Sequence, residues 1–225
     1  MKLFYKTNYF EEYGRKYDGI SDGDFALLKS FLPPMRHGST ILELGCGSCA
    51  FGQRVQGLVS GSSLVGLDIC LPLLHWSSTA CCQGDASFLP FRDESLDCIL
   101  VAAAFHHFPD IPQTLSEAYR CLRSGGILFS YEPNKLHPQR LICMTDPLRA
   151  TFYKPGDHAI SPFWMRRTMR QVGFHSVVMD FIALGDGSSS FAARAHVKLM
   201  KFVKTRFPGL SPIAAPWFVI AGRKN

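Results

Sequence analysis

Apolar and polar positions alternate in blocks through the middle of the chain. Short apolar runs rich in Ile, Leu and Val are typical of buried strands, and longer stretches with apolar residues three and four positions apart favour helices. We predict strands near 40–44, 64–68, 81–84, 96–102 and 126–131, with helices near 49–58, 72–79 and 111–122. This alternation indicates the α/β class, with a parallel sheet and helices on both faces.

The last third of the chain continues the pattern with one helix and one strand. Ser161 is a predicted N-cap, and Pro162 suits the first position of the helix that follows. We expect that helix to run to Val172 and to end at Gly173. A further strand is predicted near 176–183.

The segment from Thr40 to Ser48 is the most informative part of the chain. Its apolar run is followed by Gly45 and Gly47, which let the backbone turn sharply and let a ligand approach main-chain N–H groups. The next helix would point its N-terminus at that ligand. Glu43 lies where a carboxylate can meet a cationic or hydroxylated group. The pattern indicates a loop that binds a nucleotide-type cofactor.

Two families share this spacing. The pattern Gly45-x-Gly47-x-x-Ala50 satisfies the dinucleotide fingerprint, and Asp68 follows at about the distance of a ribose-binding acid. An NAD(P)-dependent oxidoreductase with a Rossmann fold is therefore one alternative. Glu43 argues against it, because dinucleotide folds usually carry an apolar strand residue there.

Five segments, in order and with the usual gaps, resemble class I methyltransferases that depend on S-adenosylmethionine (SAM). They are residues 43–48, 65–69, 84–91, 96–108 and 120–128. The resemblance implies a Rossmann-like, doubly wound, seven-stranded sheet that is mostly parallel, with the last strand, 217–223, antiparallel at the sheet edge. It also implies methylation of a small molecule, with S-adenosylhomocysteine (SAH) as the other product. Two residues depart from the family pattern, Cys49 in place of a third glycine and Ser124 in place of a proline.

The resemblance also implies which residues bind the cofactor. Asp68 would bond the ribose hydroxyls and Asp85 the adenine amino group. The other cofactor residues are Glu43 and the backbone of Gly45, Cys46 and Gly47 at the methionine end, Ile69 and Ala86 beside the adenine, and Ala102 and Ala103 at the end of the fourth strand. Capping of the next helix or turn is the alternative role for both aspartates.

Methyl transfer is mainly a matter of holding the nucleophile and the methyl carbon in line. A general base is needed only when the nucleophile must lose a proton. His106 and His107 follow the fourth strand and are the candidates, with a structural role as the alternative. The methylated atom, oxygen, nitrogen or carbon, stays open.

We expect a single domain over residues 1–225. Its parts are an N-terminal helical lid at 1–32, a SAM-binding core at 40–132, a substrate loop at 133–160 and a C-terminal part at 161–225 with a basic segment at 191–206. Candidate acceptor-binding residues are Tyr13 and Tyr17 in the lid and Asn134, His137, Arg140 and His158 in the loop. They suggest a small acceptor that is anionic, sugar-derived or lipidic.

Charge is uneven along the chain, whose net charge is +6. Residues 187–225 hold seven Lys and Arg and no acid. We expect 191–206 to be a helix packed on the core through Phe191, Ala195, Leu199, Phe202 and Val203, with a solvated basic face. Peripheral contact with an anionic membrane is the alternative. Nucleic acid is not expected, because no recognition module accompanies the charge.

The eight cysteines and the absence of a long apolar segment indicate in which cellular compartment we expect the protein. Cys46-x-x-Cys49 has the spacing of a redox or zinc motif, but no second pair follows at a suitable interval, so we expect no metal. Reduced thiols and the lack of a membrane span favour a cytoplasmic protein. A SAM-binding protein without catalytic activity is a further alternative.

Overall fold

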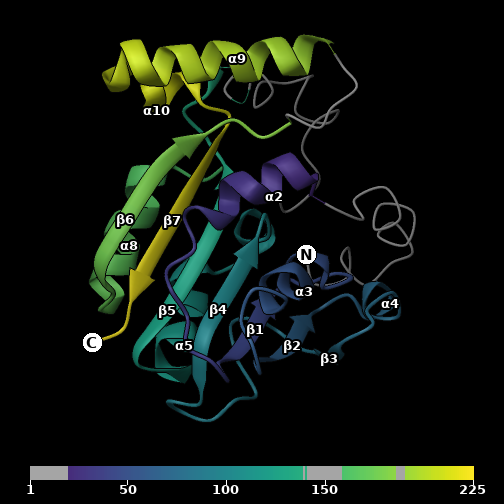
Figure 1. The fold of residues 1–225 in the computed structure, drawn as a ribbon. Helices are drawn as coiled ribbons and strands as arrows, with labels where there is room; N and C mark the ends of the chain where they lie inside the picture. Colours follow the sequence, from purple (N-terminus) through teal and green to yellow (C-terminus); the bar gives the residue numbers. More distant parts are fainter. Residues whose placement is uncertain (1–19, 139, 141–158, 186–190) are drawn as a thin grey trace.

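A seven-stranded sheet forms the centre of the molecule in the order β3-β2-β1-β4-β5-β7-β6 (Figure 1). The computed structural model describes residues 20–138, 140, 159–185 and 191–225. The strands are β1 (Thr40–Leu44), β2 (Ser63–Asp68), β3 (Ala80–Gln83), β4 (Leu96–Ala102), β5 (Leu122–Pro133), β6 (His175–Ile182) and β7 (Trp217–Arg223). Strands β1 to β5 pair in parallel, and β7 runs antiparallel to both of its neighbours. The predicted Rossmann-like architecture is confirmed.

The position of β7 differs from the prediction. We expected the last strand at the sheet edge, but it lies between β5 and β6, and β6 forms the edge. Residues 218–222 of β7 are all buried, whereas the outer strand β6 alternates between exposed and buried positions. A strand that is apolar on both faces is more stable inside the sheet, where both faces are buried, than at an edge.

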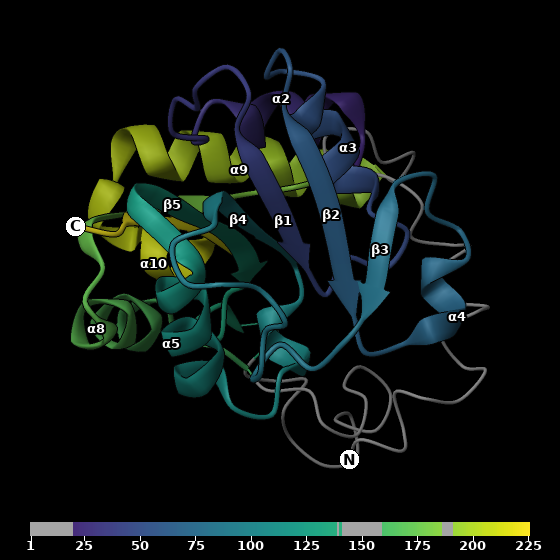
Figure 2. The ribbon, with the colours of Figure 1, turned by 90° about the horizontal axis from the view of Figure 1, so that it is seen from below.

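Helices cover both faces of the sheet (Figure 2). They are α2 (Asp22–Lys29), α3 (Ala50–Gln56), α4 (Leu71–Leu74), α5 (Ile111–Cys121), α8 (Pro162–Val172), α9 (Phe191–Arg206) and α10 (Ser211–Ala214), with short 3-10 helices η2 (Phe105–His107) and η3 (Pro208–Leu210). Helices α5 and α8 pack into one buried cluster, and α2 and α3 pack into the other. Two layers of helix therefore enclose the central strands.

Helix ends agree with the sequence pattern in part. Helix α8 begins at Pro162 and ends at Gly173, whose φ of 121° suits glycine. The hydroxyl of Ser161 makes no capping hydrogen bond, so that residue marks the helix start without stabilising it as predicted. Helix α4 ends at Leu74, earlier than expected.

Helix α9 turns a different face to the core than we predicted. Of the α9 side chains whose burial is described, Val197 and Met200 are the buried ones, at 1% and 4% exposure. The expected core residues Phe191, Leu199 and Phe202 are 81%, 57% and 59% exposed. Positions 197 and 199 lie on nearly opposite sides of a helix with 3.6 residues per turn, so only one of these faces can be buried. Among the described residues, no helix is both long and apolar enough to cross a membrane.

Candidate functional site

The loop between β1 and α3 is fastened to the end of β2. The N–H groups of Gly45 and Cys46 both donate to the carbonyl of Leu67, at 2.8 and 3.2 Å. Gly45 has a φ of +63°, and a Cβ added there would lie 2.6 Å from the Cβ of Ala104. No other residue fits this position without displacing the backbone, because it needs both a left-handed conformation and close approach. The predicted cofactor loop therefore rests on two neighbouring strands.

Asp68 and Gly47 lie against each other at the end of β2. The N–H of Gly47 donates to Asp68 Oδ2 at 2.9 Å, and the N–H of Cys70 donates to Oδ1 at 2.8 Å. Each carboxylate oxygen can accept a second hydrogen bond. A Cβ on Gly47 would meet nothing nearer than Leu73 Cδ1 at 3.9 Å. A buried carboxylate with remaining acceptor capacity, beside a glycine whose Cβ position is not crowded, fits the ribose of a nucleoside cofactor.

Burial changes the ionisation of both acids at this edge. It raises the pKa of Asp68 above its usual value, against hydrogen bonds from Cys70 and Gly47 that lower it. Burial also raises the pKa of Glu43 to about 7, although hydrogen bonds from Cys49 and Gly52 oppose that rise. The N–H of Gly52 donates to Glu43 Oε2 at 2.8 Å. Glu43 therefore ties the end of β1 to the first turn of α3.

Gly52 and Cys49 each meet a local requirement of this loop. A Cβ on Gly52 would lie 2.6 Å from Glu43 Oε2, so glycine is needed for that hydrogen bond. Sequence reasoning did not single out Gly52, since nothing local shows that a carboxylate lies against it. Cys49, in the third-glycine position, has a φ of 64° and keeps the left-handed conformation of a glycine.

The remaining predicted cofactor residues lie at the same carboxyl edge. Asp85 follows β3, and its Oδ1 accepts from the N–H of Ser87 at 2.9 Å, as in a turn. Ala86 is buried, and Ile69 follows Asp68 in a half-buried position. Ala102 and Ala103 are half-buried at the end of β4. The fold brings these predicted contacts to one edge, and their roles stay predictions.

A buried carboxylate orients one of the two candidate histidines. Glu132 is fully buried at the end of β5, and its Oε2 lies 2.7 Å from His106 Nδ1. Its Oε1 accepts from the N–H groups of Ala104 and Phe105, at 2.9 and 2.8 Å. The His107 ring centroid is 3.9 Å from that of His106. The sequence analysis did not give Glu132 a role, although an acid closing a mid-sheet strand was a visible signal.

Two of the predicted acceptor-binding residues after β5, Asn134 and His137, contact other parts of the protein. The fully buried amide of Asn134 donates to the carbonyls of Pro212 and Ala215, at 2.8 and 2.7 Å. The ring of His137 lies 5.4 Å from that of His196 on α9, and burial lowers the pKa of His137. These contacts anchor α9 and α10 beside the end of β5.

Other acceptor candidates are less completely described. The guanidinium of Arg140 lies 5.9 Å from the centre of the Trp217 ring, at the start of β7. Tyr13, Tyr17 and His158 lie outside the described residues, as do most of the predicted lid and of the substrate loop.

Comparison with known proteins agrees with this geometry. Residues 42–130 match the model of a methyltransferase domain family. A probable phthiotriol/phenolphthiotriol dimycocerosates methyltransferase of Mycobacterium ulcerans is 37% identical over 101 residues, which are 42% of this chain and 39% of that protein. A malonyl-[acyl-carrier protein] O-methyltransferase of Coxiella burnetii is 32% identical over 88 residues, 39% of this chain and 31% of that protein. The chain thus spans well under half the length of these curated relatives.

Solved structures match over more of the chain. A SAM-dependent methyltransferase of Thermotoga maritima superposes with a TM-score of 0.71 at 18% identity, covering 100% of both chains. At such low identity the likeness establishes the fold alone.

The raised pKa of Glu43 predicts a pH dependence of stability. The folded protein holds a proton on Glu43 that the unfolded chain releases above its ordinary pKa of 4.5. The free energy of unfolding should therefore fall as the pH rises from 4.5 to about 7. Glu43→Gln keeps an acceptor for Gly52 but has no carboxyl group to titrate at this position. The decrease in unfolding free energy that Glu43 causes, at most about 3 kcal/mol, should therefore be absent in this variant. Urea unfolding of both proteins across this range measures the difference.

Asp68 titrates in both proteins, so its effect largely cancels in the comparison. A constant difference between wild type and Glu43→Gln at every pH would show that Glu43 does not titrate abnormally.

Proposed function

We propose that the protein transfers a methyl group from SAM to a small-molecule acceptor and releases SAH, because residues 42–130 match the model of a methyltransferase domain family. The observation that carries this function is the buried carboxylate of Asp68, which accepts from the N–H of Gly47 in the glycine loop at the carboxyl edge of the sheet. When bound, SAM supplies an electrophilic methyl group on a sulfonium. Seven of the described cysteines are free thiols, which fits a reducing compartment such as the cytoplasm.

The residues of this chain would bind the cofactor and orient it toward the acceptor. Asp68 would accept hydrogen bonds from the ribose hydroxyls, and Asp85 from the adenine amino group. Ile69 and Ala86 would flank the adenine, and the backbone from Gly45 to Gly47 would hold the methionine end. Glu43 keeps this loop in place through Gly52. Ala102 and Ala103 leave room at the end of β4, where the acceptor meets the cofactor.

His106 can move a proton, because Glu132 orients its ring. With Nδ1–H donating to Glu132, the other ring nitrogen, Nε2, carries a lone pair that accepts a proton from an acceptor hydroxyl. The carboxylate fixes the tautomer and the ring orientation, and it stabilises the imidazolium that forms. An acceptor that is already deprotonated needs no such step.

We further propose that the acceptor is amphipathic and is reached at an anionic membrane surface. By their names, one curated relative acts on phthiotriol and phenolphthiotriol dimycocerosates and another on malonyl-[acyl-carrier protein]. Large apolar side chains are exposed along α9, η3 and α10, namely Phe191, Leu199, Phe202, Phe207, Leu210 and Ile213. We call these six residues the apolar strip. A strip of this kind on a monomer marks an interaction surface.

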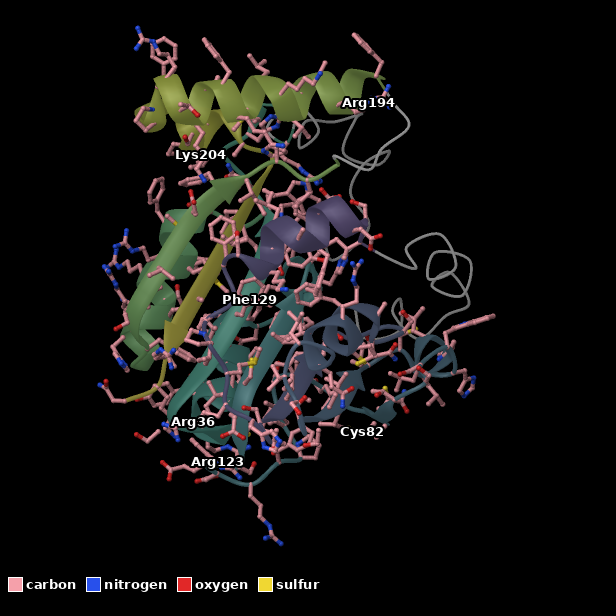
Figure 3. The ribbon with its side chains drawn as sticks, in the orientation of Figure 1. Arg36, Cys82, Arg123, Phe129, Arg194 and Lys204 are labelled. Atoms are coloured by element: carbon pink, nitrogen blue, oxygen red, sulfur yellow. The ribbon has the colours of Figure 1, made fainter. Side chains whose placement is uncertain are left out.

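Charge favours an anionic membrane as the partner of the apolar strip. Lys198 and Lys201 are exposed on the same helix, which carries no acidic residue. Lys204 lies on the inner side of α9 and donates to Asp180 at 2.6 Å (Figure 3). Exposed apolar rings among lysines are the pattern of an interfacial helix. Since Asn134 anchors α10 beside β5, docking of this surface brings the carboxyl edge of the sheet toward the lipid.

Cofactor choice can be tested by calorimetric titration with SAH, SAM and NAD in parallel. We expect SAH and SAM to bind and NAD not to bind. Asp68→Ala should weaken SAH binding at least about tenfold, because it leaves buried ribose hydroxyls unpaired. Asp93→Ala, which removes a surface carboxylate paired with Arg120, is the matched control and should bind SAH normally.

Saturable NAD binding without SAH binding would overturn the methyltransferase assignment. Normal SAH affinity in Asp68→Ala would remove Asp68 from the cofactor site.

The proton-transfer role can be tested with labelled SAM and a panel of phenol, amine and carboxylate acceptors. On a hydroxyl acceptor, His106→Gln should lower kcat roughly a hundredfold, because general-base assistance is worth about that much. The affinity for SAH should stay unchanged. His107→Gln is the neighbouring control, and a loss in that variant alone would transfer the role to His107.

Membrane docking can be tested by flotation with vesicles of phosphatidylglycerol or of phosphatidylcholine. We expect binding to the anionic vesicles, weakened by salt because the attraction acts through solvent. Lys198→Gln with Lys201→Gln should weaken it roughly thirtyfold, at about 1 kcal/mol per lysine. Leu199→Ser with Phe202→Ser should weaken it at least about tenfold, because less apolar surface enters the interface.

Arg167→Gln with Arg170→Gln, two exposed basic residues on α8, is the matched control and should float like the wild type. Equal binding by all three double variants, or none by the wild type, would reject the membrane as partner. Self-association that the Leu199 and Phe202 changes abolish would instead identify a second copy of the chain.

A further inference from the structure

Three cysteine sulfurs converge behind the cofactor loop. Cys46 and Cys49 come from the loop between β1 and α3, and Cys81 comes from β3. Their Sγ atoms all lie within 4.8 Å of one another. Cys46 and Cys49 are buried and hydrogen-bonded to each other, while Cys81 is half-buried with its Sγ 3.1 Å from Ser77 Oγ.

The local backbone makes room for this convergence. A Cβ on Gly66, in the middle of β2, would lie 2.6 Å from the sulfur of Cys46 and 2.7 Å from that of Cys81. Two sulfurs therefore border the space that any other side chain would occupy. Cys82, the next residue on β3, points its thiol elsewhere, toward the carbonyl of Gly66 at 3.6 Å, and packs against the other core cluster.

We propose that Cys46, Cys49 and Cys81 bind a thiophilic metal ion such as Zn²⁺. Zinc–sulfur bonds of about 2.3 Å in a tetrahedron place sulfurs roughly 3.8 Å apart, so the observed cluster needs to contract only slightly. A disulfide could join only two of the three sulfurs, whereas a metal ion can bind all three. Soft thiolate ligands select Zn²⁺ or Cu⁺ over harder ions.

The neighbouring groups suit such an ion. The side chain of Glu43 is hydrogen-bonded to the thiol of Cys49, so an acidic group borders the cluster. Each coordinating thiol releases its proton to solvent when the ion binds. The ion would fasten the cofactor loop to β3, and cofactor affinity and metal affinity would then change each other by the same factor.

This site does not depend on the proposed function, and its test uses no methyl transfer. Reduced, chelator-treated protein is titrated with Cd²⁺ and Co²⁺, and the thiolate-to-metal charge-transfer absorption is recorded. We expect saturation at one ion per chain. Cys81→Ser should weaken binding at least about a hundredfold, since even changes beyond the ligands cost up to that much. Cys82→Ser, one residue away on the same strand, is the matched control and should bind like the wild type.

A second variant leaves every thiol in place. Gly66→Ala adds a methyl group against two of the sulfurs and should also weaken metal binding at least about tenfold, by steric exclusion. Circular dichroism confirms that each variant is folded. The proposal is overturned if the wild type shows no saturable charge-transfer band, if Cys81→Ser binds as tightly as the wild type, or if Cys82→Ser loses as much.

Discussion

Hydrogen bonds from backbone N–H groups to three buried carboxylates hold the candidate site together. Glu43 accepts from the start of α3, Asp68 from the cofactor loop and from the turn after β2, and Glu132 from the turn after β4. Burying a carboxylate is costly unless such donors satisfy it. Each acid therefore fixes the path of a segment that leaves its own strand or a neighbouring one, and the three together shape the carboxyl edge of the sheet.

Parallel pairing explains why the three acids act in the same region. Strands β1, β2, β4 and β5 run the same way, so their carboxyl ends meet at one edge, where open α/β sheets bind ligands. Asp68 accepts from backbone N–H groups and retains acceptor capacity, whereas Glu132 also orients His106. One acid is thereby suited to bind a ligand and another to orient a side chain. This division underlies the proposed methyl transfer.

The same edge connects the site to the outer surface of the molecule. Asn134, two residues after Glu132, holds the carbonyls of α10, and His137 contacts His196 of α9. The apolar strip therefore belongs to a unit that is fastened directly beyond β5. If the strip docks on a membrane, the acceptor enters close to His106. If the thiol cluster binds a metal, the opposite end of the site, at β3, becomes rigid as well.

The sequence by itself determined the strands, the cofactor loop and its resemblance, because apolar runs and glycine spacing are local signals. Tertiary structure decided the rest. The place of β7 between β5 and β6 depends on strand pairing, and the buried face of α9 depends on what the helix packs against. The pairing of Glu132 with His106, and of Cys81 with Cys46 and Cys49, joins residues that are far apart in the sequence and belong to different elements. No local pattern encodes such contacts, since they arise only when parallel strands bring distant residues to one edge.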